Sequence, residues 1–315
     1  MRLLRHLDGA VRTPRGYVAT IGGFDGIHRG HQELLARVAC RAAEQQRDSL
    51  LITFEPLPRE YFQREDPPAR LTTLRERWRL LEQGGPEALC VLRFDERLRG
   101  CGAGEFAGML LSAGIGHLVI GHDFRAGRDG EATAEWFQKN CPARGMGVEV
   151  VSPVRDGPLR ISSRAVRQAL AQGDLEAPRV LLGRRYSMVG RVVRGQQLGR
   201  KLGFPTANLR LGRRRTPMDG IFAVRVRGLG NGHPPQHYLP GVASLGTRPT
   251  VGGVLPLLEA HVFGFDGDLY GREIEVEFVA RLRDELRFDN VDAMVVQMHR
   301  DADDARAALS RAGFD

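Results

Sequence analysis

The sequence of 315 residues contains few lysines, few aromatic residues and four cysteines. Lys139 and Lys201 are its only lysines among 46 basic residues, so arginine carries almost all of the positive charge behind the net +8. The cysteines are scattered without a C-x-x-C pair, which argues against a structural zinc site and a disulfide framework. An RNA-binding protein would need interleaved aromatics on strand faces and a concentrated basic stripe, and the 7% aromatics and diffuse charge of this chain argue against it.

Long hydrophobic runs are also missing. No apolar stretch approaches the roughly 20 residues that a membrane-spanning helix needs, and the charged opening MRLLRHLDGAVRTPRG is unlike a signal peptide. Hydrophobic residues make up 42% and charged residues 27%, as in globular proteins. We therefore expect a cytoplasmic protein of two domains with no membrane partner and no nucleic-acid partner. The oligomeric state stays open.

Up to about residue 180, short apolar runs alternate with helix-like segments. Strands are expected at 17–22, 50–54, 88–94, 117–121 and 147–151, and helices near 31–46, 72–83, 103–113 and 131–140. This alternation predicts an α/β Rossmann-like domain over 1–180, a parallel sheet with helices on both faces. Ligands of such sheets bind where the strands end.

The rest of the chain has a different pattern. Strand-like stretches separated by Gly, Pro and Asn turns lie at 186–193, 220–228, 237–246, 257–265 and 272–282. They predict an antiparallel β-barrel domain over 184–315, after a boundary near 171–185. A C-terminal helix is expected after Asp289 or Asn290, because either residue is a good N-cap.

The stretch GGFDGIHRGH follows the strand predicted at 17–22. Gly22 and Gly23 leave room for a ligand at the backbone, and the helix N-terminus that follows attracts phosphate. His28 and His31, three residues apart, can point the same way and donate hydrogen bonds to phosphate oxygens. One histidine alone would be better explained as solvated or as a helix cap, but H-x-G-H in this setting favours a phosphate site. The other candidates in this stretch are Phe24, Asp25 and Gly30.

Another strand end carries GHDFRAGRDG. Its candidates are Asp123, Phe124 and Arg125, of which an aromatic ring and a guanidinium are suited to hold a flavin or a nucleotide. An ordinary turn explains this stretch alone equally well.

The stretch RISSRAVRQAL is expected to be a loop that leads into a helix. Ser162 and Ser163 offer hydroxyls and N–H groups there, and Arg164 and Arg167 offer positive charge near leaving phosphates. For the serines alone, a simple N-cap is the plainer interpretation.

A second phosphate site is indicated by GRVVRGQQLGRKLGFPTANL. Thr206 and Asn208 are alternate residues of an extended segment and would face the same side. Their oxygens suit Mg²⁺ with substrate phosphates as further ligands, although a glycine-rich hairpin that satisfies its own backbone is the alternative. The residues expected to close over the phosphates are Gly195, Gly199, Lys201 and Gly203.

Glu259 is a carboxylate in the apolar stretch LLEAHVFGF. A strand residue that faces solvent is its simplest explanation. In the context of the neighbouring phosphate site, it is well placed to accept a proton from a substrate hydroxyl.

The stretches GGFDGIHRGH, TFEPLPREYF, GHDFRAG and ISSRAVRQAL resemble the adenylyltransferase half of bacterial bifunctional riboflavin kinases/FMN adenylyltransferases (FAD synthetases). GVASLGTRPTVGG, FDGDLYG and RLRDELRF follow the order of the riboflavin kinase half, so the resemblance covers nearly the whole chain. It implies that ATP and Mg²⁺ serve two reactions, riboflavin to FMN and FMN to FAD with release of pyrophosphate.

The resemblance also implies roles for the candidate residues. His28 and His31 would stabilise the transition state of adenylyl transfer, and Ser162, Ser163 and Arg167 would hold the leaving pyrophosphate. In the kinase half, Thr206 and Asn208 would bind the Mg-nucleotide and Glu259 would activate the 5′-hydroxyl of riboflavin. Arg283 and Phe288 would lie close to the flavin.

The sequence departs from the family pattern at three positions. Leu57 stands where a polar residue is usual, so no site role is carried over to it. Arg164 replaces a usual threonine beside the phosphates, and Ser244 replaces a common asparagine. Two other functions stay open: a nucleotidylyltransferase of another specificity with a regulatory barrel, and more distantly an RNA-binding protein.

Overall fold

The computed structural model describes residues 1–7, 13–195, 199, 202–230, 233–250 and 253–314. They form two compact units, one of Met1–Pro68 with Arg77–Ser162 and the other of Ala69–Glu76 with Ser163–Asp315. Lys201, a candidate phosphate contact, lies outside the described residues. Among the described helices, none is both long and apolar enough to cross a membrane.

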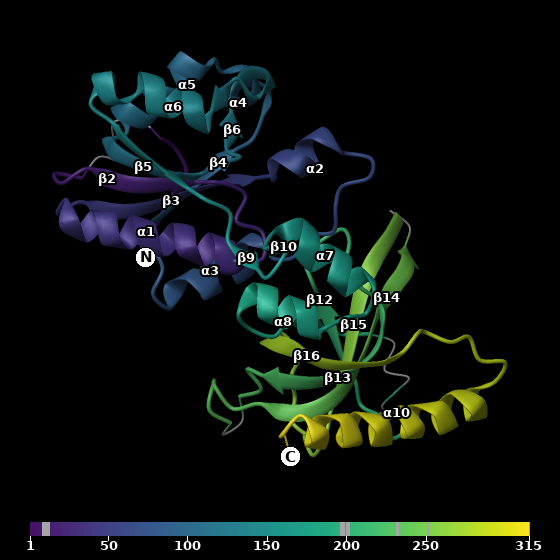
Figure 1. Ribbon diagram of the computed structural model, residues 1–315. Coiled ribbons are helices and arrows are strands. Elements are labelled where there is room, and N and C mark those ends of the chain that lie inside the picture. Colours follow the sequence, from purple (N-terminus) through teal and green to yellow (C-terminus); the bar gives the residue numbers. More distant parts are fainter. Residues whose placement is uncertain (8–12, 196–198, 200–201, 231–232, 251–252, 315) are drawn as a thin grey trace. The chain divides into compact units, whose positions relative to one another are not determined.

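The first unit is built on a six-stranded parallel sheet (Figure 1). The strands, in the order β1-β4-β3-β2-β5-β8, are β1 (Arg2–Leu4), β4 (Ala88–Arg93), β3 (Asp48–Glu55), β2 (Tyr17–Ile21), β5 (Ile115–Gly121) and β8 (Gly147–Val151). The parallel sheet confirms the sequence prediction, which had missed β1. The strand order reverses between β2 and β5, and this is the position where open α/β sheets bind ligands.

Helices cover both faces of this sheet, as predicted. On one face, Val18 of β2 packs with Val38 of α1 (Arg29–Glu44). On the other face, Tyr17 and Ala19 share a core with α5 (Ala103–Ser112) and α6 (Ala134–Asn140). Neighbouring strand residues point to opposite faces, so the apolar run of β2 is buried on both sides. Figure 1 shows α1 and the α5–α6 pair on opposite sides of the strands.

Short elements complete the first unit, and one of them, α3 (Leu74–Glu82), begins in the segment Ala69–Glu76 of the second unit. They are α2 (Pro58–Phe62), α3 (Leu74–Glu82), α4 (Glu96–Gly100), β6 (Arg125–Ala126), η2 (Arg128–Gly130), β7 (Ala132–Thr133), η3 (Pro142–Arg144), β9 (Arg155–Asp156) and β10 (Leu159–Arg160). The pairs β6–β7 and β9–β10 are small antiparallel hairpins. The β6–β7 hairpin follows β5 and Asp123, and the β9–β10 hairpin follows β8.

The second unit contains the expected closed antiparallel barrel. Its strands, in the order β11-β12-β15-β14-β13-β16, are β11 (Ser187–Val193), β12 (Ala207–Arg210), β15 (Gly253–Val262), β14 (Leu239–Thr250), β13 (Gly220–Arg227) and β16 (Glu273–Arg283). Two helices, α7 (Ser163–Ala171) and α8 (Glu176–Leu182), precede the barrel. The C-terminal helix α10 (Val291–Arg311) starts where predicted, because the side chain of Asn290 accepts a hydrogen bond from Ala293 N at 2.8 Å.

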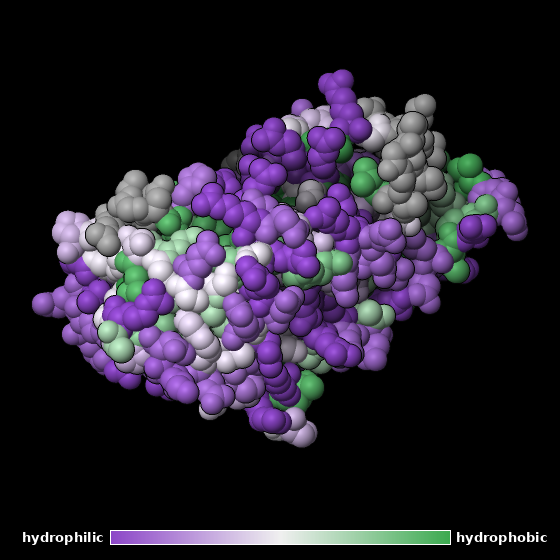
Figure 2. Space-filling view, turned by 90° about the horizontal axis from the view of Figure 1, so that it is seen from above, coloured by the Kyte–Doolittle hydropathy of each residue, from purple (hydrophilic) through white to green (hydrophobic). Residues whose placement is uncertain are grey.

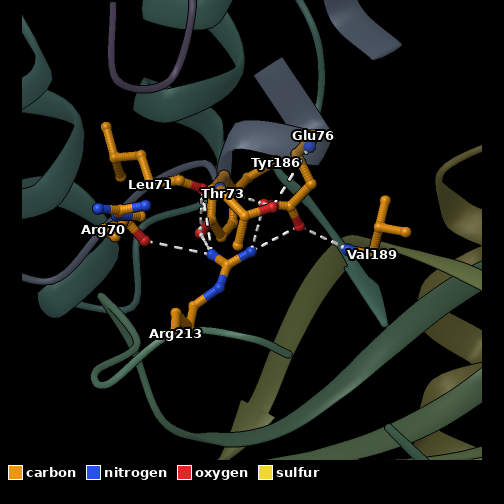
Figure 3. Close-up of polar contacts among 7 residues, drawn as sticks. All are labelled: Arg70, Leu71, Thr73, Glu76, Tyr186, Val189 and Arg213. Carbon is orange, nitrogen blue, oxygen red and sulfur yellow. Dashed lines mark hydrogen bonds and ion pairs between the residues drawn. The ribbon is translucent and has the colours of Figure 1, made fainter. Parts of the chain in front are cut away.

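A segment from the first half of the sequence, Ala69–Glu76, belongs to the second unit. Figure 3 shows the cause, which is a buried network around Arg213. The Nη2 atom of Arg213 donates to both carboxylate oxygens of Glu76, each at 2.5 Å, and its Nη1 atom donates to the Leu71 carbonyl and the Tyr186 hydroxyl. Glu76 also accepts from Val189 N at 2.7 Å. The sequence showed Arg213 only as part of a charged RRR run.

The surface in Figure 2 is mostly hydrophilic, with hydrophobic residues in small groups among the charged ones. Many large apolar side chains are buried in the cores, while others, such as Phe62 and Leu286, are exposed. Cys90, Cys101 and Cys141 are buried and Cys40 is exposed, and none of these four described residues forms a disulfide bond.

Candidate active sites

Two histidine rings stack at the start of α1 in the first unit. The ring centroids of His28 and His31 lie 3.6 Å apart with an interplanar angle of 16°. His28 is also the N-cap of α1, since its Nδ1 atom accepts from His31 N at 3.3 Å. An Nδ1 atom that accepts a hydrogen bond places the proton of the neutral ring on Nε2. His28 therefore combines the capping role at Nδ1 with an N–H donor at Nε2.

The environment of His31 keeps its ring uncharged. Burial, His28 and the positive charge of Arg77 hold the pKa of His31 well below its usual value of 6.5. The Nδ1 atom of His31 is buried and has no hydrogen-bond partner among the described residues. A buried polar atom of this kind is costly unless a ligand satisfies it. The imidazole pair is therefore suited to hydrogen bonding with an anionic group.

The turn between β2 and α1 shapes this site. Phe24 and Ile27 have φ angles of 47° and 43°, a region that L residues rarely adopt, and the Phe24 ring stacks on His31 at 4.5 Å. A side chain at Gly22 would come within 3.1 Å of the Phe24 ring, and one at Gly30 within 3.2 Å of the His28 ring. Gly22 and Gly30 therefore make room for the protein's own rings. The sequence predicted room for a ligand at Gly22 and Gly23, and a side chain at Gly23 would meet Leu57 at 3.6 Å. Asp25 is buried at 4% exposure.

Two of the three candidate residues after β5, Asp123 and Phe124, make contacts with other side chains of the protein. Asp123 pairs with Arg160 at 2.5 Å. Burial would raise the pKa of Asp123, but the Arg160 hydrogen bond and charge outweigh it and hold that pKa below 3.8. The Phe124 ring packs against Phe137 with centroids 5.8 Å apart, while Arg125 is exposed on β6. Of the three candidates, Asp123 and Arg125 are exposed and Phe124 is partly buried.

The serine stretch falls at the division between the two units. Ser162 is the last residue of the first unit, and Ser163 is the first residue of α7 in the second. Arg167, also on α7, donates from Nε to the carbonyl of Ala69 at 2.6 Å. Arg164 is exposed. In the second unit, Arg167 thus contacts the segment 69–76.

A cavity of about 520 Å³ in the second unit gathers most of the kinase candidates. Glu259 on β15 lies directly opposite Asn208 on β12 and Ser244 on β14. Its neighbours Leu258 and Ala260 are buried in the core, so Glu259 faces away from the barrel interior and into the cavity. The other predicted residues along its wall are Gly199, Thr206, Arg283 and Phe288. These residues lie up to 89 positions apart in the sequence.

Thr206 and Asn208 also line a second cavity of about 480 Å³, together with Gly195 and with Asp266 and Asp268 of the FDGDLYG stretch. Thr206 and Asn208 therefore stand at the junction of two cavities. A Cβ atom at Gly195 would lie 2.6 Å from the Asn208 amide, so the chain closes tightly over that side chain.

Gly203 lies outside both cavities and has a φ of 81° that favours glycine. Among the described residues, no group of three His, Cys, Asp or Glu side chains could hold a metal ion.

Two residues at these sites escaped the sequence analysis. Asp301 of α10 holds Arg283 through two hydrogen bonds, 2.7 Å from Nε and 2.5 Å from Nη2. Arg77 of α3 donates to the carbonyl of Gly23 at 2.8 Å. Both are buried charged residues in helices, and their spacing along the helix alone does not distinguish them from surface charges. Ser244 is also engaged, because its hydroxyl donates to Glu285 at 3.1 Å.

The first unit is a nucleotidyltransferase domain, as its parallel sheet and imidazole pair indicate. The family described as FAD synthetase matches residues 10–165, and the family described as riboflavin kinase matches residues 182–309. The chain belongs to the family of bacterial bifunctional riboflavin kinases/FMN adenylyltransferases.

Relatives with that description match almost end to end. The protein from Pseudomonas fluorescens is 43% identical over 98% of this chain and 97% of its own. The one from Escherichia coli strain K12 is 40% identical over 97% of both chains. A crystal structure described as a macrolide-efflux protein from Streptococcus pneumoniae superposes with a TM-score of 0.79 at 31% identity, covering 96% of this chain and 97% of that one.

Proposed function

We propose that residues 184–315 phosphorylate riboflavin to FMN and that residues 1–180 adenylylate FMN to FAD, each at the residues described above. The domains that carry the two activities are 184–315 and 1–180. Two observations support this assignment: the residues expected for phosphoryl transfer line one cavity, and the imidazoles expected for adenylyl transfer stack at the switch point of the parallel sheet.

Glu259 acts as the general base of the kinase step. It accepts the proton of the riboflavin 5′-hydroxyl while that oxygen attacks the γ-phosphate of ATP and ADP leaves. Its place opposite Asn208 puts the base one strand away from a residue that holds the nucleotide. Catalysis of phosphoryl transfer depends mainly on positioning the attacking hydroxyl and the phosphates relative to one another.

Thr206 and Asn208 hold Mg²⁺ with the phosphates of ATP. Both are hard oxygen donors, and the close approach of Gly195 shapes a narrow cradle around Asn208. When bound, Mg²⁺ neutralises charge that develops on the phosphates. The junction of two cavities at these residues allows a nucleotide in one and a flavin in the other.

His28 and His31 donate hydrogen bonds to the α-phosphate of ATP while a phosphate oxygen of FMN attacks it. Their help grows as negative charge builds up on the phosphate oxygens. Ser162, Ser163 and Arg167 bind the pyrophosphate that leaves. The other proposed contacts with ATP or flavin are Gly22, Gly23, Phe24, Asp25, Gly30, Asp123, Phe124, Arg125, Gly195, Gly199, Lys201, Gly203 and Arg283.

Chromatography of the flavins tests the proposal. Incubated with riboflavin, ATP and Mg²⁺, the wild type should produce FMN and then FAD. His31→Ala should stop at FMN, whereas Glu259→Ala should make no FMN yet convert supplied FMN to FAD. His117→Ala and Glu176→Ala, which change a histidine and a carboxylate outside both sites, serve as controls. Normal FMN formation by the Glu259 variant would rule out the catalytic base.

A further inference from the structure

Arg77 is a buried cation at the base of the first site. It lies on α3 with 1% of its surface exposed. Its Nη1 atom donates to the carbonyl of Gly23 and to the hydroxyl of Thr53, both at 2.8 Å, and its Nη2 atom pairs with Glu55 at 3.0 Å. Burying a guanidinium is unfavourable unless its hydrogen bonds are met. An apolar side chain would be easier to bury at this position than the charged guanidinium of Arg77.

The Gly23 carbonyl is the start of the strained turn. It accepts from Arg77 and also from the Thr53 hydroxyl at 3.2 Å. The next residue, Phe24, has a φ of 47°, followed shortly by Gly26 at 88° and Ile27 at 43°. Backbone conformations of this kind persist only where surrounding contacts impose them. Two hydrogen bonds on the carbonyl fix the peptide plane from which the turn departs.

A continuous set of contacts leads from that carbonyl to the imidazoles. Phe24 packs its ring on His31 at 4.5 Å, and His31 packs on His28 at 3.6 Å. Displacement of the Gly23 peptide would move Phe24 and with it the His31 ring. The charge of Arg77 also contributes to the lowered pKa of His31, after burial and His28.

We propose that Arg77 is a positioning residue for adenylyl transfer, which holds the Gly23 carbonyl so that the turn 23–27 places His28 and His31 against the reacting phosphate. The inference rests on the proposed function of the two histidines. Arg77 itself does not touch the substrate in this role, and it acts through the imidazoles. It should therefore influence the rate of adenylyl transfer more than the binding of ATP or FMN.

Steady-state kinetics of both activities test this role. Arg77→Met should lower kcat for FMN adenylylation by about 10- to 100-fold, as a small misplacement of catalytic groups does, with KM for ATP and FMN within about threefold. Riboflavin kinase activity in the same preparation should stay within about twofold and reports the amount of intact protein. Arg77→Lys should recover part of the rate, because an ammonium group can still donate to the carbonyl.

A double-mutant cycle separates action through His31 from other effects. In the His31→Ala background, Arg77→Met should change kcat by less than about threefold, because the ring that Arg77 positions is gone. An equal loss in both backgrounds, or an unchanged kcat in the single variant, overturns the inference. If His31→Ala itself leaves kcat unchanged, the proposed function of the imidazoles fails instead.

Two further variants cover the case in which Arg77→Met does not fold. Thr53→Val removes one donor to the Gly23 carbonyl without leaving a charge unpaired, and it should lower kcat by about 3- to 10-fold. An unchanged kcat here also counts against the inference. Arg41→Met, which breaks an ion pair with Glu149 on the same unit, is the matched control and should keep kcat within about twofold.

Discussion

Arg213 and Glu76, 137 positions apart in the sequence, form an ion pair in the interior of the second unit. The side chain of Arg213 has no exposed surface and that of Glu76 is 5% exposed. The pair attaches eight residues from the first half of the sequence, Ala69–Glu76, to the unit that contains the barrel. The second unit therefore includes a segment outside residues 182–309, the region that matches the riboflavin kinase family.

Arg213→Met should destabilise the second unit by about 3–5 kcal/mol, because the variant leaves the Glu76 carboxylate buried without its cation. Hydrogen exchange of peptides from β13 and β16 measures this unit alone. Tryptophan fluorescence reports the first unit, because Trp78 and Trp136 both belong to it. The double variant with Glu76→Leu should regain part of the loss, since no charge is then left unpaired. A double variant less stable than the single one would contradict this account.

Asp301→Asn should weaken flavin binding in the kinase cavity. Asp301 fixes the guanidinium of Arg283, and Gln297 supports it with a hydrogen bond at 2.9 Å. Without the carboxylate, Arg283 can leave the cavity wall, so KM for riboflavin should rise by about 10-fold, as expected for the loss of about 1.4 kcal/mol. Asp303→Asn, on the same helix but exposed, should leave KM unchanged. Initial rates over a range of riboflavin concentrations decide between them.

Gly195→Ala should reduce the kinase step without affecting adenylylation of supplied FMN. The added methyl group would lie 2.6 Å from the Asn208 amide, so that side chain must move away from its place between the two cavities. We expect a loss of at least about 10-fold in kcat/KM for ATP. Gly104→Ala provides the matched control, because a methyl group there meets nothing within 4 Å. Equal rates for both variants would show that the cradle tolerates a side chain.

The stability of the first unit should fall as the pH drops. The folded pKa of His31 lies below 6.5 because burial disfavours the charged ring. Between that pKa and 6.5, the unfolded chain binds more protons than the folded one, so lowering the pH favours unfolding. In urea titrations followed by tryptophan fluorescence at about pH 8 and about pH 5, His31→Gln should therefore lose less stability than the wild type.

His117 acts in the same direction, because burial also lowers its pKa. His117→Gln should remove its own share of the pH dependence, and the double variant with His31→Gln should show the smallest change. A His31 variant with the full pH dependence of the wild type would mean that its ring titrates as freely in the folded protein as in the unfolded chain.

Local patterns predicted most of the architecture. The apolar run of Tyr17–Ile21 is buried on both sides, and such runs between helices are typical of a parallel sheet. β1 was missed because its three residues include two exposed ones and it pairs only along one edge. β12 was not predicted as a separate strand, because its four residues, Ala207–Arg210, are too few to show a clear alternation of apolar and polar side chains. They were included instead in the stretch predicted to bind phosphate.

The site could be predicted where its residues follow one another in the chain. His28 and His31 form a motif within one turn, and that spacing predicts that they can point the same way. The structure adds that their rings stack. The partner of a buried charge gives no such local signal. Arg213 stood in a run of arginines that reads as surface charge, and its partner Glu76 is on a distant helix. Long-range pairing of this kind depends on the tertiary fold.

The interleaved order of the two units has a consequence for synthesis of the protein. Glu76 leaves the ribosome 137 residues ahead of Arg213, a wait on the order of 10 s at common rates of translation. For the first 75 residues of that interval, from Glu76 to Val151, the first unit also lacks its later strands, up to the end of β8. Residues 69–76 can make their contacts with the second unit only after the barrel has been synthesised. Until then, this part of the second unit must remain unpaired in the nascent chain.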